Sequence, residues 1–176
     1  MERTLAIDCK YLGTGTPGDG IPAAVYTESP TIHEGSLVFG FSQGNQIQFK
    51  QMGTEDPWAI INRMGDPSYI EFAIPSPTAA ECAQYMGGTA TGEKWEKPIN
   101  TPVIEKSVKF QTAEYKGKYV EYVITRGSIS AYLSQAPTEE ETELLLVRAT
   151  LLSAVTAEGV RKTAFTRETK EVETEP

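Results

Sequence analysis

Two glycine motifs are the first places in the sequence where chemistry would be sought. Residues 13–18 have the form G-x-G-x-x-G. In dinucleotide-binding folds this motif follows a strand and opens a helix whose N-terminus holds the pyrophosphate. Here Pro17 lies inside the motif and Pro22 follows it, so the required helix cannot form. We therefore expect a flexible glycine loop and no bound cofactor.

The second motif, residues 40–44, has the form G-x-S-x-G around Ser42. A nucleophile elbow needs a helix directly after the serine and a histidine base later in the chain. The sequence contains one histidine, His33, which precedes Ser42. The usual hydrolase order of serine, acid and histidine therefore cannot be assembled, and we expect Ser42 to be a hairpin residue and His33 a surface loop residue.

Metal ligation finds equally little support. One histidine and two distant cysteines, Cys9 and Cys82, give no ligand set for a transition metal. The glutamates at 139–143 form a run of like charge, which is typical of a solvated loop; a weak divalent-cation site there is the alternative. We expect no catalytic residue, no cofactor and no metal, and therefore a protein that is not an enzyme.

Composition limits the possible partners. The 176-residue chain has a net charge of −8, which argues against wrapping nucleic acid through phosphate contacts but permits nucleic acid to move past. No apolar run approaches the roughly 20 residues of a membrane span, and the N-terminus lacks the apolar segment of a secretory signal. We expect synthesis in a cytoplasm, with reduced cysteines and no membrane partner.

The elements that would position any site are mostly strands. Residues 101–112, 118–125, 128–134 and 143–154 each show apolar residues in alternation or in short buried runs, with brief polar separators between them. This pattern predicts a meander of four strands. It contains no group of side chains that converges on a reaction, so the meander is expected to be scaffold.

The N-terminal third predicts less regular structure. Residues 4–12 alternate as a first strand, and the glycine- and proline-rich residues 13–30 predict a long loop or arm. Residues 36–41 and 46–51 alternate on either side of a Gly-Asn pair at 44–45, which predicts a β-hairpin.

The middle of the chain contains the one predicted helix. Residues 54–67 predict a loop and residues 69–74 a strand. Ser76 is the expected N-cap, with a proline at the first helical position. The helix body is expected over 78–86, and Gly87 ends it.

These elements predict an all-β fold with one short helix, a β-sandwich or β-barrel. We expect a single domain over 1–167, with a last strand at 160–166. Residues 168–176, rich in Glu, Lys and Thr, are expected to form a flexible acidic tail.

The order of features from residue 36 to 154 resembles the tail tube (major tail) proteins of tailed bacteriophages. Three stretches carry the resemblance. The first is the strand at 36–41 with its return strand at 46–51, and the second is the helix end Tyr-Met-Gly-Gly-Thr at 85–89, followed by Trp-Glu-Lys-Pro at 95–98. The third is the strand that begins with Ile-Glu-Lys-Ser at 104–107 and leads into the meander, which ends at Val-Arg-Ala-Thr, 147–150.

The resemblance implies a β-sandwich with one flanking helix and a structural role in the virion tail. Subunits of that family close into hexameric rings whose sheets join into an inner barrel, and stacked rings form a tube through which DNA passes. The resemblance implies three partners: copies of the same chain, other tail proteins, and DNA that passes through the lumen without specific binding. It also implies synthesis in the host bacterial cytoplasm. The secreted ring proteins of bacterial injection systems look similar in fold.

Physical arguments agree with self-assembly. Exposed sheet edges aggregate unless they are paired or covered, ring closure pairs them by symmetry, and an acidic wall would let DNA slide. The lumen candidates are Glu105 and Glu121, although Lys106 and Lys109 put positive charge nearby. The candidates for subunit or ring interfaces are Leu37, Phe39, Phe41, Ile47, Phe49 and Trp58.

Three other functions remain open at this level. The chain could be another β-sandwich of the virion, such as a tail completion, neck or head decoration protein. It could be a ring protein of an injection system. A carbohydrate-binding or hydrolytic β-sandwich would need a cleft of converging aromatic and acidic side chains, which a sequence cannot display.

Overall fold

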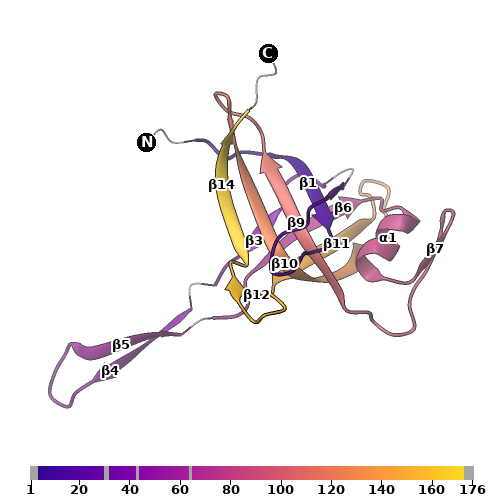
Figure 1. Cartoon of the computed structure of the whole chain (residues 1–176). Coiled ribbons are helices and arrows are strands. Elements are labelled where there is room, and N and C mark those ends of the chain that lie inside the picture. The colour runs from indigo at the N-terminus through magenta and orange to yellow at the C-terminus, as the bar shows by residue number, and fades with distance from the viewer. Residues whose placement is uncertain (1–3, 30–31, 43, 64, 173–176) are drawn as a thin grey trace.

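Strands dominate the computed structural model, which describes residues 4–29, 32–42, 44–63 and 65–172. Within these residues the fold is all-β with a single short helix (Figure 1), as the sequence predicts. The elements in chain order are β1 (Cys9–Gly15), β2 (Thr27–Glu28), β3 (Val38–Gly40), β4 (Asn45–Lys50), β5 (Pro57–Arg63), β6 (Tyr69–Pro75), α1 (Ala79–Met86), β7 (Thr89–Thr91), β8 (Lys94–Glu96), β9 (Ile104–Thr112), β10 (Lys118–Gln135), β11 (Leu144–Leu151), β12 (Ala154–Val155), β13 (Arg161–Lys162) and β14 (Phe165–Glu171).

The main sheet is organised around the 18-residue strand β10. Its strand order is β2-β1-β9-β10-β11-β6-β3, and β14 also pairs with β10. One edge of β10 pairs with β9; along the other edge, residues 118–124 pair with β14 and residues 127–135 with β11. The predicted strands of the meander are therefore confirmed, but the predicted break at Arg126 and Gly127 is wrong. These residues form an irregularity within one strand, between Ile124 and Gly127 in its pairing with β9.

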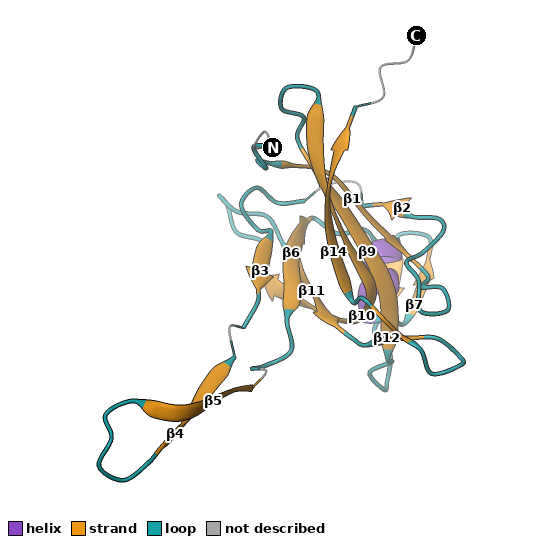
Figure 2. Ribbon diagram, turned by 60° about the vertical axis from the view of Figure 1, so that its left-hand side comes forward, coloured by secondary structure: helices purple, strands orange, loops and turns teal. Residues whose placement is uncertain are grey.

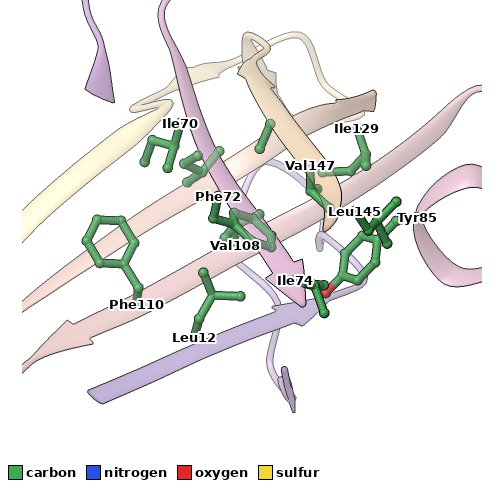
Figure 3. Close-up of a cluster of buried hydrophobic side chains, with 12 residues drawn as sticks. Leu12, Ile70, Phe72, Ile74, Tyr85, Val108, Phe110, Ile129, Leu145 and Val147 are labelled. Carbon is green, nitrogen blue, oxygen red and sulfur yellow. The ribbon is translucent and has the colours of Figure 1, made fainter. Parts of the chain in front are cut away.

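The irregularity lets β10 pass from the half of the sheet that contains β1, β9 and β14 to the half that contains β11, β6 and β3. The core lies between these two halves. Figure 3 shows side chains from β1, β6, β9, β10, β11 and α1 meeting there. The ring of Phe39 in β3 lies 5.7 Å from the Phe110 ring of β9 and 5.5 Å from the Tyr122 ring of β10. β3, the last strand in the order, therefore faces the half of the sheet that contains β9. The buried core residues are Leu12, Ile70, Phe72, Ile74, Tyr85, Val108, Phe110, Ile124, Ile129, Leu145, Val147 and Ala149.

Helix α1 packs one side chain into this core. Tyr85 is almost fully buried, contacts the Phe72 ring edge-on at 6.1 Å and shares a 2.7 Å hydrogen bond with the Ser29 hydroxyl. The helix ends at Gly87, whose φ of 76° suits glycine. The predicted N-cap, Ser76, is wrong: Thr78 caps the helix and forms a capping box with Glu81.

The N-terminal strand lies further along the chain than predicted. β1 begins at Cys9 and includes Gly13 and Gly15, so the G-x-G-x-x-G motif starts inside a strand. Gly15 is accommodated because the chain folds back closely over it; a side chain there would collide with the Val25 carbonyl. The predicted arm over 13–30 is thus reduced at its start, and it contributes β2, which pairs with β1.

The predicted hairpin between 36–41 and 46–51 is also wrong. β3 pairs with β6, whereas β4 pairs with β5. β5 lies within residues 54–67, for which the sequence predicts a loop. Gly40 lies against the ring of Tyr69, its partner in register. The absence of a side chain at Gly40 permits this contact, which places β3 in the main sheet. β3 ends at Gly40, so the chain leaves the main sheet directly after this residue.

The C-terminal residues are not only a tail. β14 runs from Phe165 to Glu171 along β10, so the acidic tail predicted from residue 168 contains the second half of a strand. Its charged sequence lacks the apolar alternation by which strands are recognised. Backbone pairing and side-chain charge pairs hold it in place, together with Phe165 at its start, whose ring packs against Phe41.

Candidate assembly surfaces

The β4–β5 hairpin, residues 45–63, is exposed to solvent along both of its strands. Figures 1 and 2 show it extending away from the main sheet. Among the described residues, β4 and β5 pair only with each other. The hairpin therefore contributes no strand to the main sheet.

Its two faces differ in chemistry. In register, Ile47 lies opposite Ile61 and Phe49 opposite Ala59, and directly opposite residues share a face of an antiparallel pair. The other face carries Gln46, Gln48, Ile60 and Asn62. The exposed fractions on the apolar face are 36% for Ile47, 41% for Phe49 and 52% for Ile61. Trp58, 72% exposed, packs its ring 6.2 Å from that of Phe49.

An isolated two-stranded hairpin is at best marginally stable in water. This hairpin keeps one apolar face and two unpaired backbone edges in solvent, both of which favour association with another surface. The arrangement can bind a protein surface through apolar contact and strand pairing.

The predicted interface residues lie at three places in the structure. Ile47, Phe49 and Trp58 lie together on the hairpin, while Leu37 packs against the core. Phe39 and Phe41 belong to an aromatic cluster at the end of the main sheet, which also contains Phe110, Tyr122 and Phe165. Phe39 and Phe41 remain 44% and 45% exposed, so this cluster is only partly covered by its own chain.

The two lumen candidates lie on one face of the sheet. Glu121 lies opposite Gln111 in register, and Gln111 and Glu105 are an even number of positions apart along β9. Phe110, between them in alternation, points into the core, so both glutamates belong to the face away from the core. Whether that face lines a channel stays a prediction.

Each of these glutamates has a basic partner that the sequence alone did not identify. Arg126 donates two hydrogen bonds to Glu105, at 2.7 and 2.9 Å. Lys170 of β14 donates to Glu121 at 2.5 Å, and Gln111 donates to its other carboxylate oxygen at 2.7 Å. Neither carboxylate is therefore an isolated negative charge. The pairing of Glu121 with Lys170 gave no signal in the sequence, because Lys170 lay in the predicted tail.

The pKa shifts follow from this geometry. Burial raises the pKa of the Glu121 carboxyl. Hydrogen bonds from Lys170 and Gln111, together with the charges of Lys170 and Lys109, lower this pKa by more than burial raises it, so it lies below the ordinary value. The hydrogen bond to Glu121 raises the pKa of Lys170. The pair is therefore charged at neutral pH.

The motifs considered for catalysis do not converge. His33 donates its backbone N–H to the Ala73 carbonyl, and the Ser42 hydroxyl accepts a hydrogen bond from the Gly44 N–H. The residue between Ser42 and Gly44 lies outside the described residues. The described part of the chain brings no three potential metal ligands together, and both cysteines are free.

No helix in the described ranges has the length and apolar character needed to cross a bilayer. Comparison with protein-family models and with curated proteins found no match for this chain.

Proposed function

We propose that this chain is a structural subunit of a bacteriophage tail tube, which assembles through copies of itself into stacked rings around a channel for DNA. In this proposal the bent sheet with one helix is the tail-tube type of β-sandwich, and the rings are hexameric. The virion tail is its location after synthesis in the host bacterium. Its role is structural, with no catalytic step.

The observation that carries the proposal is the β4–β5 hairpin. It extends from the body with an apolar face that the chain does not cover (Figure 2). A subunit that must hold neighbours in a ring or a stack needs such a surface.

The passage of DNA fits the acidic character of the chain, since its net charge is −8. A negative wall repels phosphates and allows a duplex to slide. Because Glu105 and Glu121 are paired with Arg126 and Lys170, the free negative charge of a lumen would have to come from other carboxylates.

The test is the state of the purified protein at high concentration. We expect light scattering to show oligomers, and negative-stain electron microscopy to show rings or stacked tubes. A monodisperse monomer at all concentrations would contradict self-assembly. Discrete rings that never stack would favour the alternatives, a neck, completion or injection-system ring protein.

A further inference from the structure

A pocket of about 410 Å³ opens beside the C-terminal end of α1, and we call it the α1 pocket. Met86 and Ala131 in its lining pack against the core. Tyr132 and Leu133 at its rim are exposed, so the rim is apolar surface that the described chain leaves uncovered. The apolar residues of the lining are Met86, Trp95, Pro98, Ala131, Tyr132 and Leu133.

The α1 pocket carries one positive charge. Lys97 is the single charged residue among its described lining residues, and it forms no ion pair with the described chain. Nearby charges do not cancel it, because Lys94 pairs with Glu96 and Glu93 lies in the β7–β8 turn outside the lining. The pocket therefore suits an apolar group with a carboxylate beside it.

The tip of the β4–β5 hairpin, residues 51–56, has the complementary chemistry. Met52 is fully exposed, and methionine side chains adapt to irregular pockets. Glu55 and Asp56 are also exposed, and neither is ion-paired in the described structure. Lys50 precedes the tip but lies opposite Pro57, on the glutamine face. The tip thus presents one apolar side chain and two carboxylates.

The tip is ordered within the single chain. The Thr54 N–H and the Thr54 hydroxyl both donate to the Gln51 carbonyl, at 3.2 and 2.9 Å, and close the turn. A turn fixed in this way loses less conformational entropy on binding than a loose loop does.

The α1 pocket and the hairpin lie at opposite ends of β6. Through the register of the sheet, Leu133 is level with Leu145 and with Ile74, near the end of β6. The hairpin leaves the body after Gly40, which is level with Tyr69 at the start of β6. Five residues of strand separate these levels by about 17 Å, and Figures 1 and 2 show the hairpin pointing away from the body on a different side from α1. The tip of one copy therefore points away from its own pocket.

We infer that the hairpin tip of one copy binds in the α1 pocket of the next copy, with Met52 in the apolar lining and Glu55 or Asp56 beside Lys97. The inference rests on the proposed self-assembly and names the two surfaces that meet. The apolar face of the hairpin adjoins the tip and extends the contact along the pocket rim. Because the two surfaces differ, the contact is head-to-tail, and repeating it gives a closed ring or a filament.

Two variants test this contact by complementation. Met52→Glu disables the tip and leaves the pocket intact, whereas Tyr132→Glu places a carboxylate on the pocket rim, where it repels the acidic tip. Both positions are exposed, so each variant should fold, which circular dichroism can check. We expect each variant alone to stop at its smallest species in sedimentation. An equal mixture should double in mass and grow no further, because one functional tip and one functional pocket remain.

A charge reversal tests the orientation of the contact. Lys97→Glu should raise the concentration needed for assembly roughly two- to fivefold, as expected for an exposed ion pair. Adding Glu55→Lys and Asp56→Lys to the same chain should restore assembly, and failure to restore it would overturn the pairing at Lys97. Lys116→Glu, in the exposed turn between β9 and β10, is the matched control and should assemble as wild type.

The outcomes separate this contact from the proposed function. A mixture of folded variants that keeps the mass of its parts would overturn the contact. Tubes formed by the wild type and by both variants would also overturn it and leave the proposed function standing. A mixture that doubles in mass, with a wild type that never forms rings or tubes, would support the contact and contradict the tube. A wild type and a mixture that both stay monomeric would contradict both.

Discussion

The body and the β4–β5 hairpin use the same sequence pattern and reach opposite degrees of burial. In β9, Val108 and Phe110 alternate with Lys109 and Gln111 and are 0% and 2% exposed; in β4, Ile47 and Phe49 alternate with glutamines and are 36% and 41% exposed. Alternation thus identifies a face that needs covering. It does not identify which molecule covers it.

The two regions should therefore respond differently to substitution. In the body, each apolar side chain already contributes to the stability of the single chain. In the hairpin, an apolar side chain contributes to that stability only marginally, because it stays largely exposed in the single chain; under the proposed self-assembly it gains burial when another copy binds. Measurements of unfolding and of assembly separate these contributions.

The largest effect on unfolding is expected in the core. Phe72 is fully buried and contacts Tyr85, so Phe72→Ala removes apolar burial and leaves a cavity. We expect a loss of about 3–5 kcal/mol in the free energy of unfolding, measured by chemical denaturation under conditions where the protein is monomeric. A loss below about 1 kcal/mol would mean that the core is not the source of body stability.

The pair between Glu121 and Lys170 should rank next. Lys170→Met leaves a Glu121 side chain that is 9% exposed without its cation. Because the Lys170 side chain is itself 37% exposed, we expect a loss of about 2 kcal/mol at neutral pH, less than for fully buried pairs. Glu168→Gln is the control, since Glu168 lies 3.7 Å from Lys170 and is exposed.

This pair also gives a pH dependence of known sign. The folded-state pKa of Glu121 is lowered, so its contribution is present above the unfolded-state pKa and is lost as the pH falls through the folded-state pKa. The folded-state pKa of Lys170 is raised, so its contribution is lost as the pH rises through that value. The difference between wild type and Lys170→Met should therefore shrink in acid; a constant difference would show that packing, not charge, explains it.

A smaller effect is expected at the helix cap. Thr78→Ala removes the hydroxyl that accepts the Glu81 N–H and should cost about 1 kcal/mol of unfolding free energy. Ser76→Ala is the matched comparison, because Ser76 precedes the helix and bonds to the Thr142 hydroxyl at an exposed site. The reverse ranking of the two variants in thermal unfolding would restore Ser76 as the cap.

The smallest effect on body stability is expected in the hairpin. Phe49→Ser combined with Ile61→Ser should change the unfolding free energy of the monomer by less than about 0.5 kcal/mol, yet abolish assembly in light scattering. Gln46→Ser combined with Gln48→Ser alters the opposite face equally and should assemble as wild type. Assembly that survives the first variant would remove the hairpin from the interface.

Local patterns were sufficient for the parts of the fold that local physics determines. The meander, the strand before the helix and the helix end at Gly87 follow from alternation and from glycine geometry. The partners of β3 and β4 did not follow, because a Gly-Asn pair predicts a turn but not whether its flanks pair. The choice was made by contact between Gly40 and Tyr69, which are far apart in sequence.

The candidate surfaces were predictable in composition but not in arrangement. The apolar residues of the hairpin were identified as interface candidates, although the hairpin was built from the wrong strands. The partner of Glu121 was missed because β14 has no apolar alternation to reveal it. The charged part of this strand, residues 168–171, is held by backbone pairing and charges and cannot be distinguished in sequence from a solvated tail.

The bend in β10 has a consequence for how this molecule opens. β10 is hydrogen-bonded to β9, β14 and β11. Because both halves of the sheet share this strand, neither half can unfold without disturbing the hydrogen bonds of the other. The body should melt in one cooperative event, and its slowest amide exchange should follow β10 through the bend. The hairpin shares none of these bonds, so it can fray and re-form while the body stays intact.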